Sequence, residues 1–175
     1  MLSEIAYTVT FLEMTARPQR ARPHAPLVDG LLLMRAEKAP LHFLRYLYDT
    51  VGRDYEWTDL HAWSDADLAA FARHDEVSLH VLHLTGWPAG FAMLDARAAG
   101  VIDLAYFGMT PEATGRGLGD WLLGTMVHMA WDRGPRKLTV NTCSLDHPRA
   151  LPLYQKWGFA PVRREERRRK VAARS

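Results

Sequence analysis

The chain has 175 residues, of which 48% are hydrophobic and 24% are charged, and its formal net charge is +2. This composition excludes a largely disordered chain and predicts a single globular domain over residues 1–175. No apolar stretch approaches the length of a membrane span, and the N-terminus lacks the basic and apolar regions of a secretory signal. The single cysteine, Cys143, excludes an internal disulfide and suits a reducing compartment, so we expect the protein in the cytoplasm.

The charge is unevenly distributed, because residues 163–175 form a basic tail. Seven basic and two acidic residues give this segment a charge of +5, and the rest of the chain carries −3. A basic tail can bind nucleic acid or a membrane surface. This one lacks interleaved aromatic residues and lies at a terminus, where charged runs are commonly solvated, so we expect neither partner.

The first 26 residues predict a strand followed by an irregular connector. Polar and apolar residues alternate over residues 6–14, and prolines interrupt residues 16–26. Two arrangements are open for this segment: it caps one edge of a sheet, or it pairs with a second subunit in a homodimer.

The rest of the chain alternates between strands and helices and contains no internal repeat. Turn signals separate the strands, and Gly134 with Pro135 ends the clearest helical pattern. The predicted elements are a strand at 31–36, helices at 40–51 and 64–74 (with Ser64 as N-cap), strands at 77–86, 88–97 and 100–110, a helix at 118–131, a strand at 137–142, a helix at 147–158 and a strand at 159–165.

Three glycines alternate in the segment ATGRGLGDW, residues 113–121, which leads into the helix predicted at 118–131. Small residues let successive backbone N–H groups converge on a phosphate, and the positive end of a helix dipole points the same way. The Walker loop does not fit because its lysine is absent, and the dinucleotide fingerprint needs a glycine where Asp120 stands. The spacing that fits is Gln/Arg-x-x-Gly-x-Gly/Ala, with Thr114, Gly117 and Gly119 in the three named places.

The segments DLAYFGMTPEATGRGLGDWLL and DHPRALPLYQKWGF resemble the GNAT N-acetyltransferase superfamily, and the resemblance covers about residues 31–162. It implies an α/β (α+β) fold with a mixed, mostly antiparallel central sheet whose strands splay apart between flanking helices. It also implies an acyltransferase that uses acetyl-CoA as co-substrate and acetylates a primary amine. In that family the glycine loop binds the pyrophosphate of acetyl-CoA.

Carried over to this sequence, the resemblance assigns the cofactor mainly to backbone groups. A strand end binds the pantetheine arm as if it were a further strand, and the loop amides bind the pyrophosphate. Thr114 stands where the family has glutamine or arginine, a loss that Arg116 offsets in part, and His147 stands where relatives have asparagine. The expected cofactor-binding residues are Phe107, Gly108, Met109, Thr114, Gly115, Arg116, Gly117, Leu118, Gly119 and His147.

Acetyl transfer to an amine needs a base, an oxyanion donor and an acid for the departing thiolate. The resemblance makes Tyr154 the acid, Asp103 the base acting through a bridging water, and the backbone N–H of Met109 the oxyanion donor. Two alternatives stay open: Tyr154 packs on the core with a surface hydroxyl, and Asp103 faces solvent or forms an ion pair. Pro152 disfavours a helix interior, so the helix that carries Tyr154 either starts late or kinks.

The sequence defines the acetyl acceptor less closely than it defines the cofactor site. Residues 45–63 gather aromatic side chains and carboxylates, which suit a cationic amine, and Arg53, which suits a substrate carboxylate; core and surface roles are equally open. We favour a small-molecule amine over a protein lysine or N-terminus, because nothing resembles a peptide-docking module. A non-catalytic acyl-CoA sensor and a nucleic-acid-associated protein are the other candidates.

No metal site is expected from the sequence. Cys143 is predicted to be a buried hydrophobic residue, and His80 and His83 face opposite sides of a strand, so they make a poor pair of metal ligands.

Overall fold

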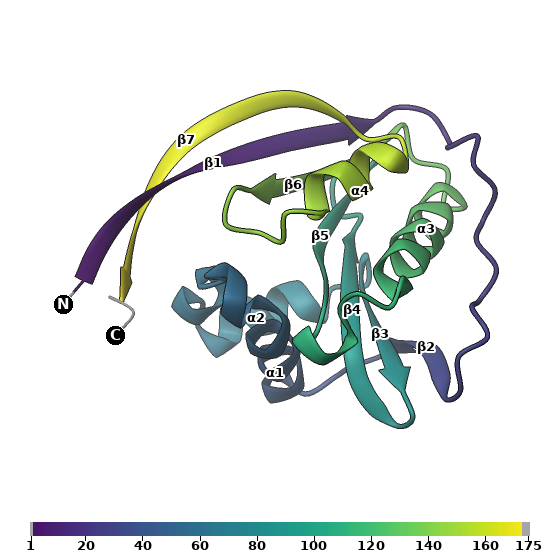
Figure 1. Ribbon diagram of the computed structural model, residues 1–175, viewed down its shortest axis with the longest axis horizontal. Coiled ribbons are helices and arrows are strands. Elements are labelled where there is room, and N and C mark those ends of the chain that lie inside the picture. Colours follow the sequence, from purple (N-terminus) through teal and green to yellow (C-terminus); the bar gives the residue numbers. More distant parts are fainter. Residues whose placement is uncertain (1, 173–175) are drawn as a thin grey trace.

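A computed structural model of the protein describes residues 2–172, and its elements build one sheet with helices on both faces (Figure 1). In chain order they are β1 (Leu2–Met14), β2 (Leu31–Ala36), α1 (Leu41–Gly52), the 3₁₀ helices η1 (Arg53–Tyr55) and η2 (Asp59–Ala62), α2 (Asp65–Ala72), β3 (Val77–Leu84), β4 (Trp87–Asp95), β5 (Val101–Met109), η3 (Pro111–Ala113), α3 (Leu118–Trp131), β6 (Lys137–Cys143), α4 (Ala150–Lys156) and β7 (Ala160–Ala172).

The seven strands follow the order β2-β3-β4-β5-β6-β1-β7. Neighbouring strands are antiparallel, except that β5 and β6 are parallel. The expected mixed α/β fold with a mostly antiparallel sheet is therefore confirmed. Among residues 2–172, none of the helices has both the length and the apolar character needed to cross a membrane.

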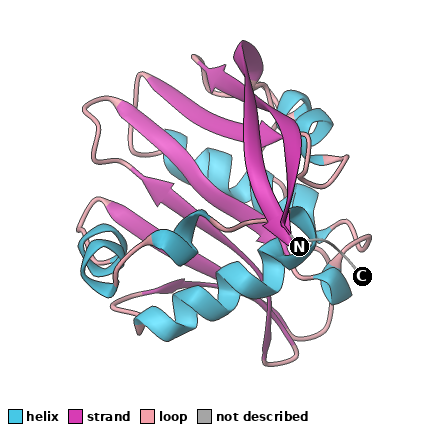
Figure 2. Ribbon diagram, turned by 90° about the vertical axis from the view of Figure 1, so that its left-hand side faces the viewer, coloured by secondary structure: helices cyan, strands magenta, loops and turns pink. Residues whose placement is uncertain are grey.

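Two hydrophobic cores lie on opposite sides of the sheet, and Figure 2 shows helices on either side of the strands. On one side, α3 packs through the fully buried Leu122 and Leu123. On the other side, α1 and α2 pack through Leu44 and Leu68 against Phe91 of β4. Apolar side chains on both faces of β4 account for its nearly continuous apolar sequence.

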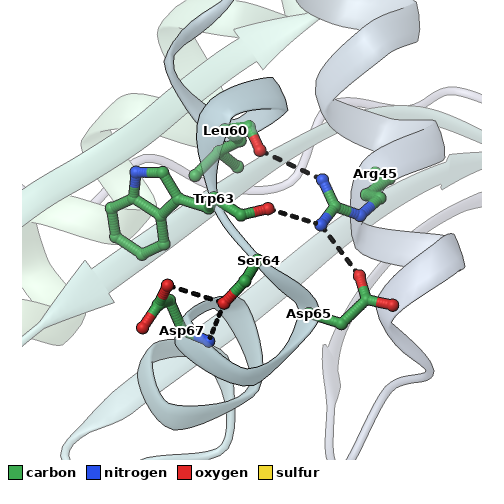
Figure 3. Close-up of polar contacts among 6 residues, drawn as sticks. All are labelled: Arg45, Leu60, Trp63, Ser64, Asp65 and Asp67. Atoms are coloured by element: carbon green, nitrogen blue, oxygen red, sulfur yellow. Dashed lines mark hydrogen bonds and ion pairs between the residues drawn. The ribbon is translucent and has the colours of Figure 1, made fainter.

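The start of α2 is fixed by hydrogen bonds that the sequence predicts in part (Figure 3). Ser64 Oγ accepts a hydrogen bond from the backbone N–H of Asp67 at 3.1 Å, so the expected N-cap is confirmed. Arg45 of α1 donates to the backbone oxygens of Leu60, at 3.0 Å, and Trp63, at 3.1 Å. These bonds hold η2 and the start of α2 against α1.

β1 and β7 form a two-stranded ribbon that extends past the body of the protein (Figure 1). They pair from Leu2–Ala172 to Glu13–Ala160, whereas β1 pairs with β6 only from Val9 onward. Residues 2–8 and 166–172 therefore have each other as their strand partners. Strand β1 therefore lies inside the sheet, between β6 and β7, and does not cap an edge of it, whereas pairing with a second subunit stays a prediction.

The basic tail is the main correction to the sequence-based expectation. We expected a short strand at 159–165 and a solvated charged run beyond it, but β7 continues to Ala172. Residues 173–175 lie outside the described residues. Most side chains of β7 are exposed, so the charges are solvated as expected while the backbone is ordered by pairing with β1. The arginines concealed the strand because they occupy both of its faces.

His80 gives the fold a predictable dependence on pH. The ring, 4% exposed on β3, hydrogen-bonds with Ser78 Oγ at 3.1 Å. Burial, with a smaller effect of the Arg35 charge, lowers the pKa of His80 from 6.5 to about 4. Between these values the unfolded chain binds a proton that the folded chain does not. The free energy of unfolding should therefore fall by up to about 3 kcal/mol as the pH drops through this window.

Urea unfolding of the wild type, His80→Gln and the exposed-site control His42→Gln at pH 7 and pH 4 measures this effect. The His80→Gln variant should lose much less stability between the two pH values than the other two proteins. An equal loss in all three would show that His80 does not cause the dependence.

Candidate active site

The candidate site is a cavity of about 680 Å³ that opens where β5 and β6 separate. The two strands pair over only three positions, from Val101–Lys137 to Asp103–Thr139. Beyond them, residues 104–109 of β5 line one side of the cavity, and Asn141 and Cys143 of β6 line the other. The expected splay of the sheet is present at this point.

The exposed edge of β5 offers the backbone groups of alternate residues to the cavity. Thr110 N donates to Ala89 O at 2.9 Å, and the ladder continues in register through Met109, Gly108 and Phe107. Antiparallel pairs alternate between hydrogen-bonded and non-hydrogen-bonded. The N–H and C=O groups of Gly108 therefore point to β4, and those of Phe107 and Met109 point into the gap.

The glycine loop borders the same cavity at the start of α3. Gly115 and Gly117 have φ values of +82° and +75°, and a Cβ added to either would meet no atom within 4 Å. Gly117 is also the N-cap residue of α3, so backbone N–H groups at this helix start have no partner within the helix. Gly115, Gly117, Gly119 and Thr114 all line the cavity.

The side chains of the three non-glycine loop residues differ in where they point. Thr114 Oγ1 donates to Thr110 O at 3.0 Å, so its hydroxyl is directed to the backbone. Leu118 is buried in the core, which leaves only its backbone amide for a ligand. Arg116 is exposed and its side chain is outside the cavity lining.

Tyr154 lies on α4, is 5% exposed and lines the cavity. Its ring packs between Phe107, at 6.1 Å, and Phe159, at 6.0 Å. Burial, and to a lesser extent the charge of Asp146, raises the pKa of Tyr154, so the phenol keeps its proton at neutral pH. Helix α4 begins at Ala150, three residues later than predicted, which places Pro152 in its first turn, where a missing N–H costs no helical hydrogen bond.

Asp103 is the one predicted catalytic residue that does not line the cavity. It lies on β5 in the short paired segment, and its Oδ1 accepts a hydrogen bond from Thr139 Oγ1 at 2.5 Å. Burial raises the pKa of Asp103, and the charge of Asp95 on β4 adds to this effect, while the bond from Thr139 opposes it. Of the two predicted catalytic side chains, Tyr154 therefore lines the cavity and Asp103 does not.

Asp146 holds parts of the site together through hydrogen bonds, and this role was not predicted from the sequence. Its carboxylate accepts hydrogen bonds from Trp57 Nε1 at 3.0 Å, Thr142 Oγ1 at 2.7 Å and Cys143 N at 2.8 Å. These bonds tie the loop between η1 and η2 to the loop before α4. The neighbouring His147, which we expected to bind the cofactor, lines the cavity, and its ring lies edge-on to Tyr55.

Aromatic side chains form another part of the cavity wall. Tyr48, Trp57 and Tyr106 pack against one another with ring centroids 5.4–6.1 Å apart, and all three line the cavity. Of the aromatic set predicted from residues 45–63, Tyr46 and Trp63 lie outside this wall. Tyr106 was missed because the strand pattern alone does not show which face of β5 meets the cavity.

The β1–β7 ribbon closes the remaining side. Tyr7, Arg167 and Arg169 line the cavity. Arg169 donates to Asp59 Oδ1 at 2.9 Å and to the backbone oxygen of Glu56, so it joins the ribbon to the η1–η2 segment. These arginines were missed because the tail was assigned to solvent. Within residues 2–172, no cluster of His, Cys, Asp and Glu could hold a metal ion.

The chain matches the acetyltransferase (GNAT) family over residues 44–159, which is more than half of its length. It therefore belongs to the GNAT acetyltransferase family. The match begins within α1 and ends after α4, so it includes the splayed strands, the glycine loop and Tyr154. No curated protein matches the sequence.

Several solved structures share the fold. A GCN5-related N-acetyltransferase from Kribbella flavida has a TM-score of 0.58 at 17% identity, covering 91% of this chain and 56% of its own. A Drosophila protein has a TM-score of 0.69 at 15% identity, covering 99% of this chain and 53% of its own. A GNAT acetyltransferase from Elizabethkingia anophelis with acetyl-CoA bound has a TM-score of 0.54 at 16% identity, covering 75% of this chain and 77% of its own. The chain thus spans little more than half of the first two proteins.

Gly117 provides a test of the loop. Replacing Gly117 with leucine places a side chain in the cavity, and the positive φ adds a strain of about 1 kcal/mol. Calorimetric titration with acetyl-CoA should show no measurable binding to Gly117→Leu, while circular dichroism shows a folded protein.

The matched control is Gly134→Leu, because Gly134 has φ +71°, open space around its Cβ position and no place in the cavity lining. It carries the same strain and should bind acetyl-CoA normally. Wild-type affinity in Gly117→Leu would show that the loop is only a turn.

Proposed function

We propose that the protein is an N-acetyltransferase that moves the acetyl group of acetyl-CoA to a primary amine of a small molecule, by direct attack in a ternary complex. The observation that carries this proposal is the free β5 edge, whose Phe107 and Met109 backbone groups border the same cavity as the glycine loop and Tyr154. A thioester cofactor with two amides and a pyrophosphate matches that set of donors and acceptors. The bound acetyl-CoA in the Elizabethkingia relative supports the choice of cofactor.

In this proposal the pyrophosphate end of acetyl-CoA lies at the glycine loop, and its pantetheine arm lies along the β5 edge. The pyrophosphate occupies the N-terminus of α3, where the amides of Gly115 to Gly119 and the helix dipole favour negative charge. The pantetheine arm takes the place of a strand beside Phe107 and Met109. Met109 lies beside the glycine loop, because a Cβ on Gly119 would be 3.6 Å from its Cγ. The thioester, at the other end of the arm, therefore lies beside Phe107, whose ring centroid is 6.1 Å from that of Tyr154.

In the proposed reaction the neutral amine attacks the thioester carbonyl and forms a tetrahedral intermediate. The N–H of Phe107, which points into the gap near Tyr154, donates to the oxyanion in place of the Met109 N–H expected from the sequence. Collapse of the intermediate breaks the C–S bond, and the Tyr154 hydroxyl gives its proton to the departing thiolate. The nitrogen of the new amide loses its extra proton, which returns through water to the Tyr154 oxygen. The products are the N-acetylated amine and CoA.

The proton of the ammonium form must leave before attack, and we assign its acceptor to Asp103. Because Asp103 lies outside the cavity lining, the transfer runs through water. The raised pKa of Asp103 brings this carboxylate closer to the pH range in which a base operates.

Related folds support a small acceptor. An aminoglycoside acetyltransferase from an uncultured soil metagenomic sample resembles this chain with a TM-score of 0.59, and an IAA acetyltransferase from Bacillus cereus does so with a TM-score of 0.52. We extend this to a small-molecule amine here, because the ribbon and the η1–η2 segment bound the acceptor side of the cavity. The single cysteine supports a cytoplasmic location.

Tyr154→Phe tests the acid. Removing the hydroxyl should lower kcat by about a hundredfold, since a general acid contributes about that much, while the Kd for acetyl-CoA changes by less than about threefold. Thiol release with an amine panel measures kcat, and calorimetry measures the Kd. Tyr46→Phe, on α1 and outside the cavity lining, is the control.

Full kcat in Tyr154→Phe would remove the tyrosine from the mechanism. Saturable acetyl-CoA binding without thiol release from any amine would instead support the non-catalytic acyl-CoA sensor.

Asp103→Asn tests the base through the pH profile. In the wild type, kcat/KM should fall on the acid side as Asp103 becomes protonated, and Asp103→Asn should lower the rate about tenfold or more and remove that limb. Asp95→Asn is the companion variant: the charge of Asp95 raises the pKa of Asp103, so its loss should move the acid limb to lower pH without lowering the plateau. An unchanged profile in Asp103→Asn would contradict the assignment.

A further inference from the structure

The charged groups on the acceptor side of the cavity differ in how completely they are paired. Asp146 accepts three hydrogen bonds from the protein. Asp59 forms an ion pair with Arg169, whose guanidinium also donates to the backbone oxygen of Glu56. The carboxylates of Asp146 and Asp59, which line this side, therefore already have partners in the protein. For this reason we do not expect them to bind a second cationic group of the acceptor, in addition to its reacting amine.

Arg167 is differently placed. The β1–β7 register puts Arg163, Glu165 and Arg167 opposite Phe11, Val9 and Tyr7. Paired residues of an antiparallel ladder share a face, and Val9, Tyr7 and Arg167 line the cavity, so this face of β7 is turned towards it.

Two guanidinium groups share one carboxylate on that face. Glu165 Oε2 accepts from Arg167 Nη2 at 2.6 Å, and Glu165 Oε1 forms an ion pair with Arg163. The guanidinium carbon of Arg163 lies 3.9 Å from the centroid of the Phe11 ring, and that of Arg167 lies 5.8 Å from it. The group carries one surplus positive charge, and the Arg167 side chain is 49% exposed.

The fixed position of Arg167 suits it to bind an anion. A guanidinium held by a carboxylate and an aromatic ring loses little conformational entropy on binding. Glu165 accepts from Nε and Nη2 of Arg167, at 3.1 Å and 2.6 Å, so the Nη1 group is the donor that is left for a substrate carboxylate. The net charge of +1 on Arg163, Glu165 and Arg167 can be balanced by a ligand group that carries a single negative charge. The aromatic wall of Tyr48, Trp57 and Tyr106 lies on the same side of the cavity and suits an apolar part of the acceptor.

We propose that the acceptor carries a carboxylate in addition to its amine, and that Arg167, held by Glu165 and Phe11, binds this carboxylate. The inference rests on the proposed acetyl transfer and adds the substrate class: amino acids or similar amino carboxylates. It also gives the basic segment of the chain a role in specificity. Arg167 selects among acceptors and takes no part in bond making or breaking.

The test uses pairs of amines that differ only in a carboxylate. Thiol release from acetyl-CoA is measured with L-alanine against ethylamine and with L-phenylalanine against 2-phenylethylamine. The wild type should prefer the carboxylate member of at least one pair by about tenfold or more in kcat/KM, the size expected of a charge-assisted contact. Arg167→Gln should reduce that ratio to about threefold or less, mainly through KM.

Arg164→Gln is the matched control, because it removes the same charge from the opposite face of the same strand. It should keep the wild-type ratio. An equal preference in the wild type, or an unchanged ratio in Arg167→Gln, would overturn the proposal. O-Phosphoethanolamine that outperforms every carboxylate in an Arg167-dependent manner would also overturn the carboxylate assignment, in favour of phosphate.

Failure of the proposed function gives a different result. If no amine releases thiol, acetyl transfer is wrong, and calorimetric titration of the CoA-bound protein with the same pairs then decides the binding claim. Tighter binding of the carboxylate member in the wild type, lost in Arg167→Gln and kept in Arg164→Gln, supports the Arg167 site. Equal affinities, or no binding of any carboxylate, overturn it.

Discussion

After Asp103, β5 has no strand on one side, because β6 diverges from it, and the cavity depends on that edge remaining unpaired. Unpaired backbone groups inside a sheet cost free energy unless water or a ligand satisfies them. The strand end is held in place by packing: Ala105 forms a bulge opposite β4, and Gly108 lets Val51 of α1 approach so closely that a Cβ would lie 2.3 Å from it. The same groups that weaken the sheet thus form the edge to which we assign the pantetheine arm.

The walls around this edge come from segments that are distant in the sequence, and a few polar contacts hold them together. Asp146 joins the loop before α4 to Trp57, and Arg169 joins the ribbon to Asp59. Both contacts lie on the proposed acceptor side of the cavity, whereas the glycine loop, on the proposed cofactor side, is held by the start of α3. The cofactor side is therefore built from local structure, and the acceptor side is built from long-range contacts.

This division explains which parts of the site could be predicted from the sequence. The glycine loop and the Ser64 cap depend on neighbouring residues, so spacing alone indicated them. The role of Arg167 depends on pairing with β1, and a run of arginines conceals strand alternation when both faces are charged. The placement of Asp103 depends on where β5 and β6 separate, which is a property of two strands and leaves no local pattern.

The ribbon also sets an order of assembly. Thr8 and Glu166, which hydrogen-bond across it, are 158 residues apart in sequence, whereas the β3–β4 hairpin joins neighbouring residues. Contacts between distant residues form slowly, because a long loop must close before they stabilise the chain. During synthesis, β1 is made before β7, so residues 2–8 of β1, which pair only with β7, have no strand partner until β7 is made. The cofactor side can form before then, but the acceptor side is complete only when translation of β7 has ended.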